Sequence, residues 1–171
     1  RGFEFTQPMY WNISPGMDAT IVPHYMSDRG LQLGTEYRYL TRNNKGVLWG
    51  DYLNNDDITD TDRWRYDVQT TTMLPWEWRA RINAEGVSDE NYFEDMGSSI
   101  SQTSQVALRR QAGLEYYDSV WTMFMQVQDF QTLDPLIPPS DEPYTQAPQI
   151  VAKSYWPDAP IGREYGLDSE A

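Results

Sequence analysis

The sequence of 171 residues contains no cysteine and a single histidine, His24. Without cysteine, this chain has no disulfide, no thiolate nucleophile and no cysteine metal ligand. One histidine leaves no zinc site or catalytic dyad, except one built from carboxylates and hydroxyls. We therefore expect a protein that is not an enzyme and that holds neither a cofactor nor a metal.

The sequence is also short of basic residues and of long apolar runs. Lys and Arg number 13 against 26 Asp and Glu, so the formal net charge is −13 and the pI is about 4.3. A chain with this charge repels the phosphate backbone, which argues against nucleic acid as a partner. No segment approaches the roughly 18 consecutive apolar residues of a membrane-spanning helix.

Aromatic residues, in contrast, are abundant in a hydrophilic chain. There are 7 Trp and 12 Tyr, and aromatics reach 14% while the mean hydropathy is −0.71. A membrane β-barrel explains both properties, because each strand shows lipid only every second residue and aromatic rings gather at the two membrane interfaces.

The stretch from Gly2 to Leu40 predicts three strands joined by turns at 14–16 and 27–30. Its third strand alternates with a period of two, which only an extended strand produces. One face holds Leu31, Leu33, Thr35, Tyr37 and Tyr39, and the other holds Gln32, Gly34, Glu36 and Arg38.

Later segments repeat this alternation, and short connections alternate with long ones. Strands are predicted near 47–53, 63–72, 78–85, 106–117, 120–133, 149–156 and 164–171, with an acidic connection at 54–62, a polar one at 86–105 and a Pro-rich one at 134–148. Because proline lacks the backbone donor, the last of these is expected to lie outside the strands.

The predicted fold class is all-β, an antiparallel up-and-down transmembrane β-barrel segment. The whole chain, 1–171, is expected to form this partial barrel without a separate second domain. It starts without Met or a signal peptide and stops inside a predicted strand, so we expect an internal piece. An open sheet cannot survive in lipid, so further strands must close it.

The same residues resemble the LptD family of outer-membrane LPS-assembly proteins. The run PMYWNISPGMDATIVPHYMSDRGLQLGTEYRYL is similar to the start of the membrane barrel in that family. The segments DYLNNDD, RW, VSDENYFEDMGSS, QDFQTL and PYTQAPQI then follow in the family's order. The resemblance implies LPS transport and insertion into the outer leaflet of the bacterial outer membrane. It also implies as partners LPS, outer-membrane lipids, an LptE-like lipoprotein plug and a periplasmic LptA-like bridge that acts through a preceding domain.

Two other functions remain open on the residues alone. A different outer-membrane barrel, such as a solute channel or porin, has the same alternation but a permanently closed seam. A soluble β-sandwich could instead bind carbohydrate through its aromatic residues.

The loop pattern raises a further question: if the chain enters from the periplasm, the long connections fall on the periplasmic side, which is unusual. Either the strand count in the first fifty residues is off by one, or these connections are unusual.

Pro8 and Pro23 lie inside the first two predicted strands, where each removes a backbone donor. They could mark bulges near a barrel rim. They could also loosen the seam between the first and last strands, so that it forms a lateral gate for an amphipathic lipid. The resemblance favours the gate, because both prolines fall where the family's opening strands carry them.

Several charged residues on the polar faces are candidates for contact with LPS in the lumen. The arginine fork suits the phosphates of a glycolipid. For Arg63, Arg65, Arg79 and Arg81, ion pairing with Asp67, Glu77 and Glu85 is the alternative that we favour, because carboxylates are in excess nearby. The candidates are Glu36, Arg38, Arg63, Arg65, Arg79 and Arg81.

Two further clusters are expected to be structural. The oxygen-bearing side chains of 54–62 could hold calcium, but the segment lacks the Gly and the terminal Glu of a calcium loop, which favours a solvated connection. Five residues match a motif of the family and are expected to shape the connection at 86–105: Ser88, Asp89, Tyr92, Phe93 and Asp95.

Overall fold

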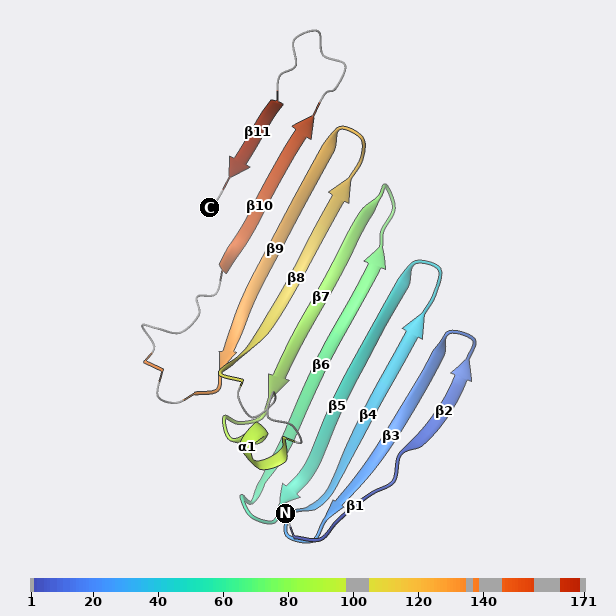
Figure 1. Ribbon diagram of the computed structural model, residues 1–171, viewed down its shortest axis with the longest axis vertical. Coiled ribbons are helices and arrows are strands. Elements are labelled where there is room, and N and C mark those ends of the chain that lie inside the picture. Colours follow the sequence, from blue (N-terminus) through green and yellow to red (C-terminus); the bar gives the residue numbers. More distant parts are fainter. Residues whose placement is uncertain (1, 98–104, 135–136, 139–145, 156–163, 170–171) are drawn as a thin grey trace.

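The computed structural model describes residues 2–97, 105–134, 137–138, 146–155 and 164–169. They form one antiparallel sheet in which β1 and β2 both pair with β3 and, from β3 onward, each strand pairs with the next along the chain (Figure 1). The predicted all-β, up-and-down fold is therefore confirmed. The elements are β1 (Glu4–Thr6), β2 (Met9–Ser14), β3 (Met17–Met26), β4 (Gly30–Leu40), β5 (Asn44–Asp56), β6 (Thr61–Met73), β7 (Trp78–Val87), α1 (Tyr92–Met96), β8 (Ala107–Tyr117), β9 (Trp121–Thr132), β10 (Gln146–Tyr155) and β11 (Glu164–Ser169).

The sheet is open within the described residues. β1 and β2 form one edge, β11 forms the other, and the two edges do not pair with each other there. An unpaired edge exposes backbone donors and acceptors, which lipid cannot satisfy. This is the arrangement expected of a barrel segment that other strands complete. None of the described helices has both the length and the apolar character needed to cross a membrane.

One face of the sheet is apolar, and we call it the outer face. Alternation along each strand and register across strands place large apolar side chains side by side on it. Leu33 lies opposite Tyr52, which lies opposite Trp64, and all three are exposed. A second row across β8, β9 and β10 consists of Leu114, Met125 and Ile150.

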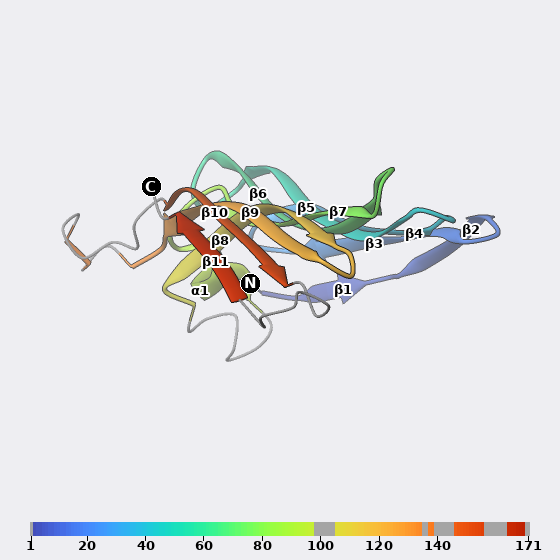
Figure 2. The same cartoon turned by 90° about the horizontal axis from the view of Figure 1, so that it is seen from above.

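The opposite face, here called the inner face, is polar. Its clearest row crosses β6, β7, β8 and β9 and consists of Gln69, Asn83, Gln111 and Gln128. Figure 2 shows the sheet as a single curved layer, with α1 beneath it. A small apolar cluster joins α1 to the neighbouring strands: Val87, Tyr92, Phe93, Leu108 and Leu133.

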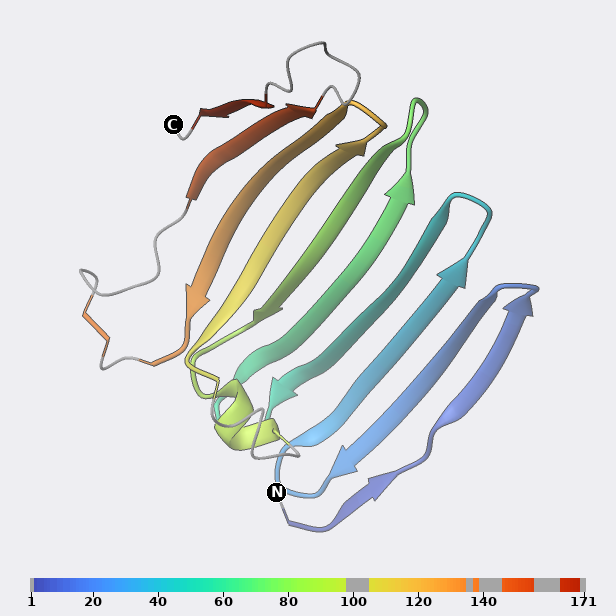
Figure 3. The ribbon, with the colours of Figure 1, turned by 45° about the horizontal axis from the view of Figure 1, so that its top comes forward.

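The two ends of the sheet differ in their connections. Short connections at 15–16, 41–43, 74–77 and 118–120 share one end, which we call the turn end (Figure 3). β7 and β9 end at the opposite end of the sheet, which we call the helix end because α1 lies there, and β1 begins there as well (Figure 1). β1 and β2 keep one register against β3 and count as a single strand, so the strand count in the first fifty residues was right.

Some predicted boundaries were wrong. The first predicted strand is interrupted at Gln7 and Pro8, because a proline breaks the pairing there. The predicted acidic connection begins later than expected, since β5 runs on to Asp56. Pro148 lies within β10, although its segment was expected to contain no strand; the register shifts between Gln146 and Gln149, and such an irregularity accommodates a missing donor. Residue 156 and residues 170–171 of the predicted strands lie outside the described residues.

Candidate functional site

The two prolines of the opening strands lie almost opposite each other. Glu4 pairs with Met26 and Met9 pairs with Ile21, so the register is the same on both sides of the interruption. Continuing it places Gln7 opposite Pro23 and Pro8 opposite Val22. The amide of Gln7 donates to the carbonyl of Pro23 at 3.2 Å, which confirms the first of these pairs.

The two prolines remove donors on different sides of the opening strand. In an antiparallel pair, a hydrogen-bonded pair normally exchanges two bonds. Gln7 and Pro23 exchange only one, because Pro23 has no N–H. Backbone groups alternate direction along a strand, so the nitrogen of Pro8 faces away from β3, toward the open edge. Pro8 thus removes a donor from the edge that an additional strand would use.

The opening strand is weakly held in other respects as well. β1 has three residues and β2 has six, and both pair with β3 alone. Their outward side chains are exposed, with 55% of Phe5 and 59% of Trp11 accessible. A segment with few buried contacts opens more readily than the rest of a fold. The strand formed by β1 and β2 is therefore more easily separated from β3 than a strand that is paired on both sides.

A chain of polar contacts joins this edge to α1 along the inner face. Nε2–H of His24 donates to the carboxylate of Glu4 at 2.9 Å, and Nδ1 lies 3.2 Å from the amide oxygen of Gln32. The amide of Gln32 donates to the hydroxyl of Tyr92 at 3.0 Å. Burial raises the pKa of Tyr92, so its hydroxyl stays protonated. The edge strand and the helix are thus connected through β3 and β4.

Two arginines and three aspartates form a charged cluster at the helix end. Arg63, 1% exposed, donates to Asp89 at 2.9 and 2.6 Å and to Asp95 at 2.5 Å. Arg29 donates to Asp56 at 2.5 Å and lies 3.0 Å from Asp95. These contacts hold the connection that carries α1 against the sheet.

The aromatic residues of the family-like motif complete this attachment. The guanidinium of Arg63 lies 5.5 Å from the ring centre of Tyr92, and that of Arg65 lies 5.3 Å from the ring centre of Phe93. Ser88 donates to Asp89 at 2.6 Å. The expected structural role of the motif is confirmed, because its carboxylates and rings anchor the connection.

The other lumen candidates also lie on the inner face, but with partners that differ from those expected. Arg38 lies 2.7 Å from Asp18 and 3.4 Å from Glu36, while Arg79 and Arg81 lie 3.5 and 3.2 Å from Glu115. Ion pairing is confirmed for Arg63, Arg79 and Arg81, although with other partners than Asp67, Glu77 and Glu85. Of those expected carboxylates, Glu85 interacts electrostatically with Arg65. Except for Glu36, which shares β4 with Arg38, these partners come from other strands or from the α1 connection, which alternation along one strand does not reveal.

The acidic segment at 54–62 directs its oxygens toward donors within the protein. Asp56 accepts from Arg29, and Asp62 accepts from the hydroxyl of Tyr52 and the amide of Asn55, each at 2.9 Å. In the part of the chain that the structure describes, no group of three His, Asp or Glu side chains is arranged to hold a metal ion.

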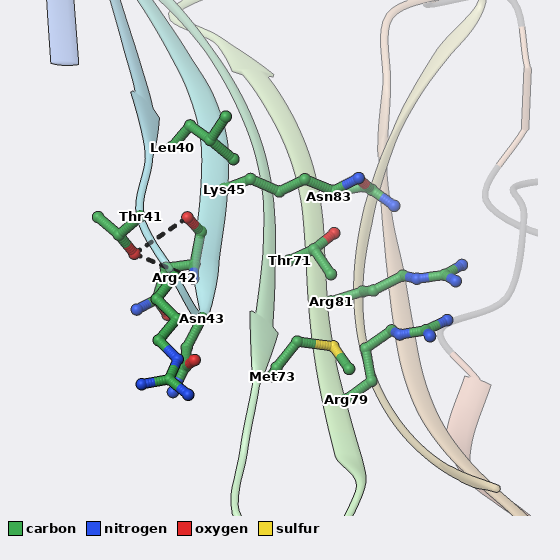
Figure 4. Close-up of a pocket in the computed structure, with 11 residues that line it drawn as sticks. Leu40, Thr41, Arg42, Asn43, Lys45, Thr71, Met73, Arg79, Arg81 and Asn83 are labelled. Atoms are coloured by element: carbon green, nitrogen blue, oxygen red, sulfur yellow. Dashed lines mark hydrogen bonds between the residues drawn. The ribbon is translucent and has the colours of Figure 1, made fainter. Parts of the chain in front are cut away.

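A basic groove opens at the turn end. It has a volume of about 610 Å³ and is shown in Figure 4. Arg79 and Arg81 are candidates from the sequence. Arg42 and Lys45 are not among them, because the predicted strand begins near residue 47, whereas β5 already begins at Asn44. The remaining lining residues are Leu40, Thr41, Asn43, Asn44, Thr71, Met73 and Asn83.

Comparison with known proteins gives a consistent set of relatives. The sequence model of a family described as "LptD: LPS transport system D" matches residues 61–171. The LPS-assembly protein LptD of Pseudoalteromonas atlantica is 38% identical over 171 residues, which cover 99% of this chain and 22% of that protein. The protein of the same name from Azoarcus sp. is 39% identical over 172 residues, covering 99% and 21%. The chain spans about a fifth of the length of the curated relatives that it matches.

Proposed function

This chain belongs to the LptD family, and on that premise we propose that residues 1–171 supply the first strands of an outer-membrane β-barrel that inserts LPS into the outer leaflet. We take the whole chain as one partial barrel with no separate second domain. The proposed task is transport rather than catalysis: the protein shields acyl chains while the phosphorylated sugar passes through a wet lumen.

The two faces of the sheet support a membrane barrel. Rows of exposed apolar side chains on the outer face suit lipid, and rows of amide side chains on the inner face suit a water-filled interior. A soluble sandwich would need a second sheet against the apolar face, and the described residues form only one. Membership of the family argues against a solute channel.

The observation that carries the gate is the position of Pro8 in the opening strand and of Pro23 in β3, almost opposite it. One proline weakens the attachment of that strand to β3, and the other removes a donor from the edge that the last strand of a closed barrel would meet. A seam that lacks these hydrogen bonds opens at lower cost than the rest of the wall. We propose that the lipid part of LPS leaves sideways through it.

The proposal includes partners that this chain does not contain. LPS would arrive from a periplasmic LptA-like bridge through a preceding domain, and an LptE-like lipoprotein would occupy the lumen. The resemblance of the opening strands supports these partners. The helix end, where the chain begins, would then face the periplasm, with α1 narrowing the lumen on that side.

The test replaces both prolines in the full-length protein with residues that can donate. The variant P8A/P23A should restore up to two hydrogen bonds, and one or two kcal/mol corresponds to about 5- to 30-fold slower opening. LPS delivery to the cell surface, measured as the rate at which new LPS becomes accessible from outside, should fall accordingly. The control P75A changes a proline in the connection between β6 and β7, away from the edge, and should leave delivery unchanged. Normal delivery by a correctly folded P8A/P23A protein would refute the gate.

A further inference from the structure

The basic groove is built on one row of the inner face at the turn end. Lys45 lies opposite Thr71, Thr71 lies opposite Arg81, and Arg81 lies opposite Gly113. Neighbouring strands are about 4.8 Å apart, so the backbones at Lys45 and Arg81 are separated by roughly 10 Å. Thr71 between them is short, and Gly113 has no side chain. The row therefore places two long cations on either side of an open space.

Other groups complete the lining of this space. Arg79 and Asn83 flank Arg81 along β7, each two residues away from it, so all three lie on the same face. Figure 4 shows Lys45, Arg79 and Arg81 extending toward the same side of the sheet, with Thr71 between them. The groove thus offers cationic, amide and hydroxyl donors to one ligand.

Positive charge is in surplus here, although the chain as a whole is strongly acidic. Lys45 has no ion pair within the part of the chain that the structure describes, and Arg79 and Arg81 share a single carboxylate, that of Glu115. Three cations therefore face one carboxylate in a chain of net charge −13. Arg63 at the helix end, by comparison, meets three aspartates.

We infer that Lys45, Arg79 and Arg81 form a binding site for a phosphate monoester carried on the sugar of the transported glycolipid. This inference rests on the proposed function and adds a defined contact point at the turn end. A phosphate monoester presents three oxygens and nearly two negative charges, which match several cations better than one carboxylate does. Arginine supplies paired donors of fixed geometry, and lysine supplies a mobile point charge.

The test uses photo-crosslinking in the full-length protein. One probe replaces Met73, which lines the groove without belonging to the cationic set. The other replaces Thr20, which lies opposite Glu36 on the inner face near the opening strands. We expect both probes to capture LPS. Capture at residue 73, but not at residue 20, should fall about tenfold in K45Q/R79Q/R81Q, because charge-assisted contacts are lost.

The second part of the test uses LPS whose phosphates have been removed by a phosphatase. The probe at residue 73 should capture this LPS about tenfold less than untreated LPS, and the probe at residue 20 should capture both equally. Unchanged capture at residue 73 with dephosphorylated LPS, or in the triple variant, would overturn the inference. A different result would be that inorganic phosphate at millimolar concentration lowers LPS capture at residue 73 while dephosphorylation of LPS has no effect. That result would show that the groove binds a free anion, and it would also overturn the inference. Absence of LPS capture at both positions would instead reject the proposed function.

Controls separate loss of binding from loss of structure. R110Q removes one positive charge from a residue opposite Ala84 on the outer face, and should leave capture at both positions unchanged. K45Q alone leaves the pairs with Glu115 in place and should still lower capture at residue 73. K45Q alone therefore still tests the inference if K45Q/R79Q/R81Q fails to fold.

Discussion

Replacing Arg63 with methionine should release α1 from the inner face. Arg63 is almost fully buried and bonds two aspartates of the α1 connection, Asp89 and Asp95. Removing one partner of a buried ion pair costs about 3–5 kcal/mol. The lower value applies here, because the two aspartates are 38% and 31% exposed and can regain water. A loss of about 3 kcal/mol increases local opening roughly a hundredfold.

Hydrogen–deuterium exchange of the peptide 88–97 in the full-length protein measures this opening directly. R63M should speed exchange of that peptide about a hundredfold while leaving β8 and β9 protected. R38M is the matched control, since the pairs of Arg38 are half-exposed and screened by water, so their loss should leave the exchange of this peptide unchanged. Combining R63M with D89N and D95N should return the exchange rate of the peptide 88–97 to within about tenfold of that in the unmodified protein, because Asp89 and Asp95 no longer leave an unpaired charge. Exchange in R63M no faster than in R38M would refute this account of the cluster.

Two further substitutions test the opening strands and the polar chain. Gly16 has φ +81°, and an added Cβ would collide with the carbonyl oxygen of Leu40. G16A should therefore destabilise the protein by about 1–2 kcal/mol and lower the temperature at which the folded form is lost in a heat-dependent gel shift. G50A should leave that temperature unchanged, because a Cβ at Gly50 meets only the carbonyl oxygen of Arg65 at an ordinary contact distance. If G16A and G50A melt alike, the strain assigned to this turn is absent. Q32L should leave the buried hydroxyl of Tyr92 without its donor at a cost of about 1–3 kcal/mol, and should speed exchange of α1 less than R63M does. Equal exchange in Q32L and the parent protein would show that the polar chain does not hold the helix.

Local alternation was sufficient to predict the faces of the sheet. Leu31 and Leu33 are exposed on the outer face and Gln32 is buried on the inner face, as the period of two requires. This succeeds because side chains alternate across any extended strand, whatever its neighbours are. The effect of Pro8 was partly predictable for the same reason: loss of a donor is a property of proline itself.

Contacts between distant segments were not predictable in this way. Asp89 and Asp95 follow Arg63 by 26 and 32 residues, and only the folded connection brings them to it. The sequence offered Asp67 and Glu85 as nearer partners, but nearness along the chain does not set distance in space. Likewise, Lys45 lies in a strand that lines the basic groove because β5 begins at Asn44, before the predicted start of that strand near residue 47.

By itself, then, the sequence determined the strand pattern, the acidic charge, the two faces and the resemblance to LptD proteins. Those properties are local or compositional. The tertiary structure decided that Gln7 faces Pro23, that α1 lies on the inner face, and that Lys45 and Arg81 share one row. Each of these depends on the register between strands, which is set by turns and packing across the whole sheet and is not written in any single strand.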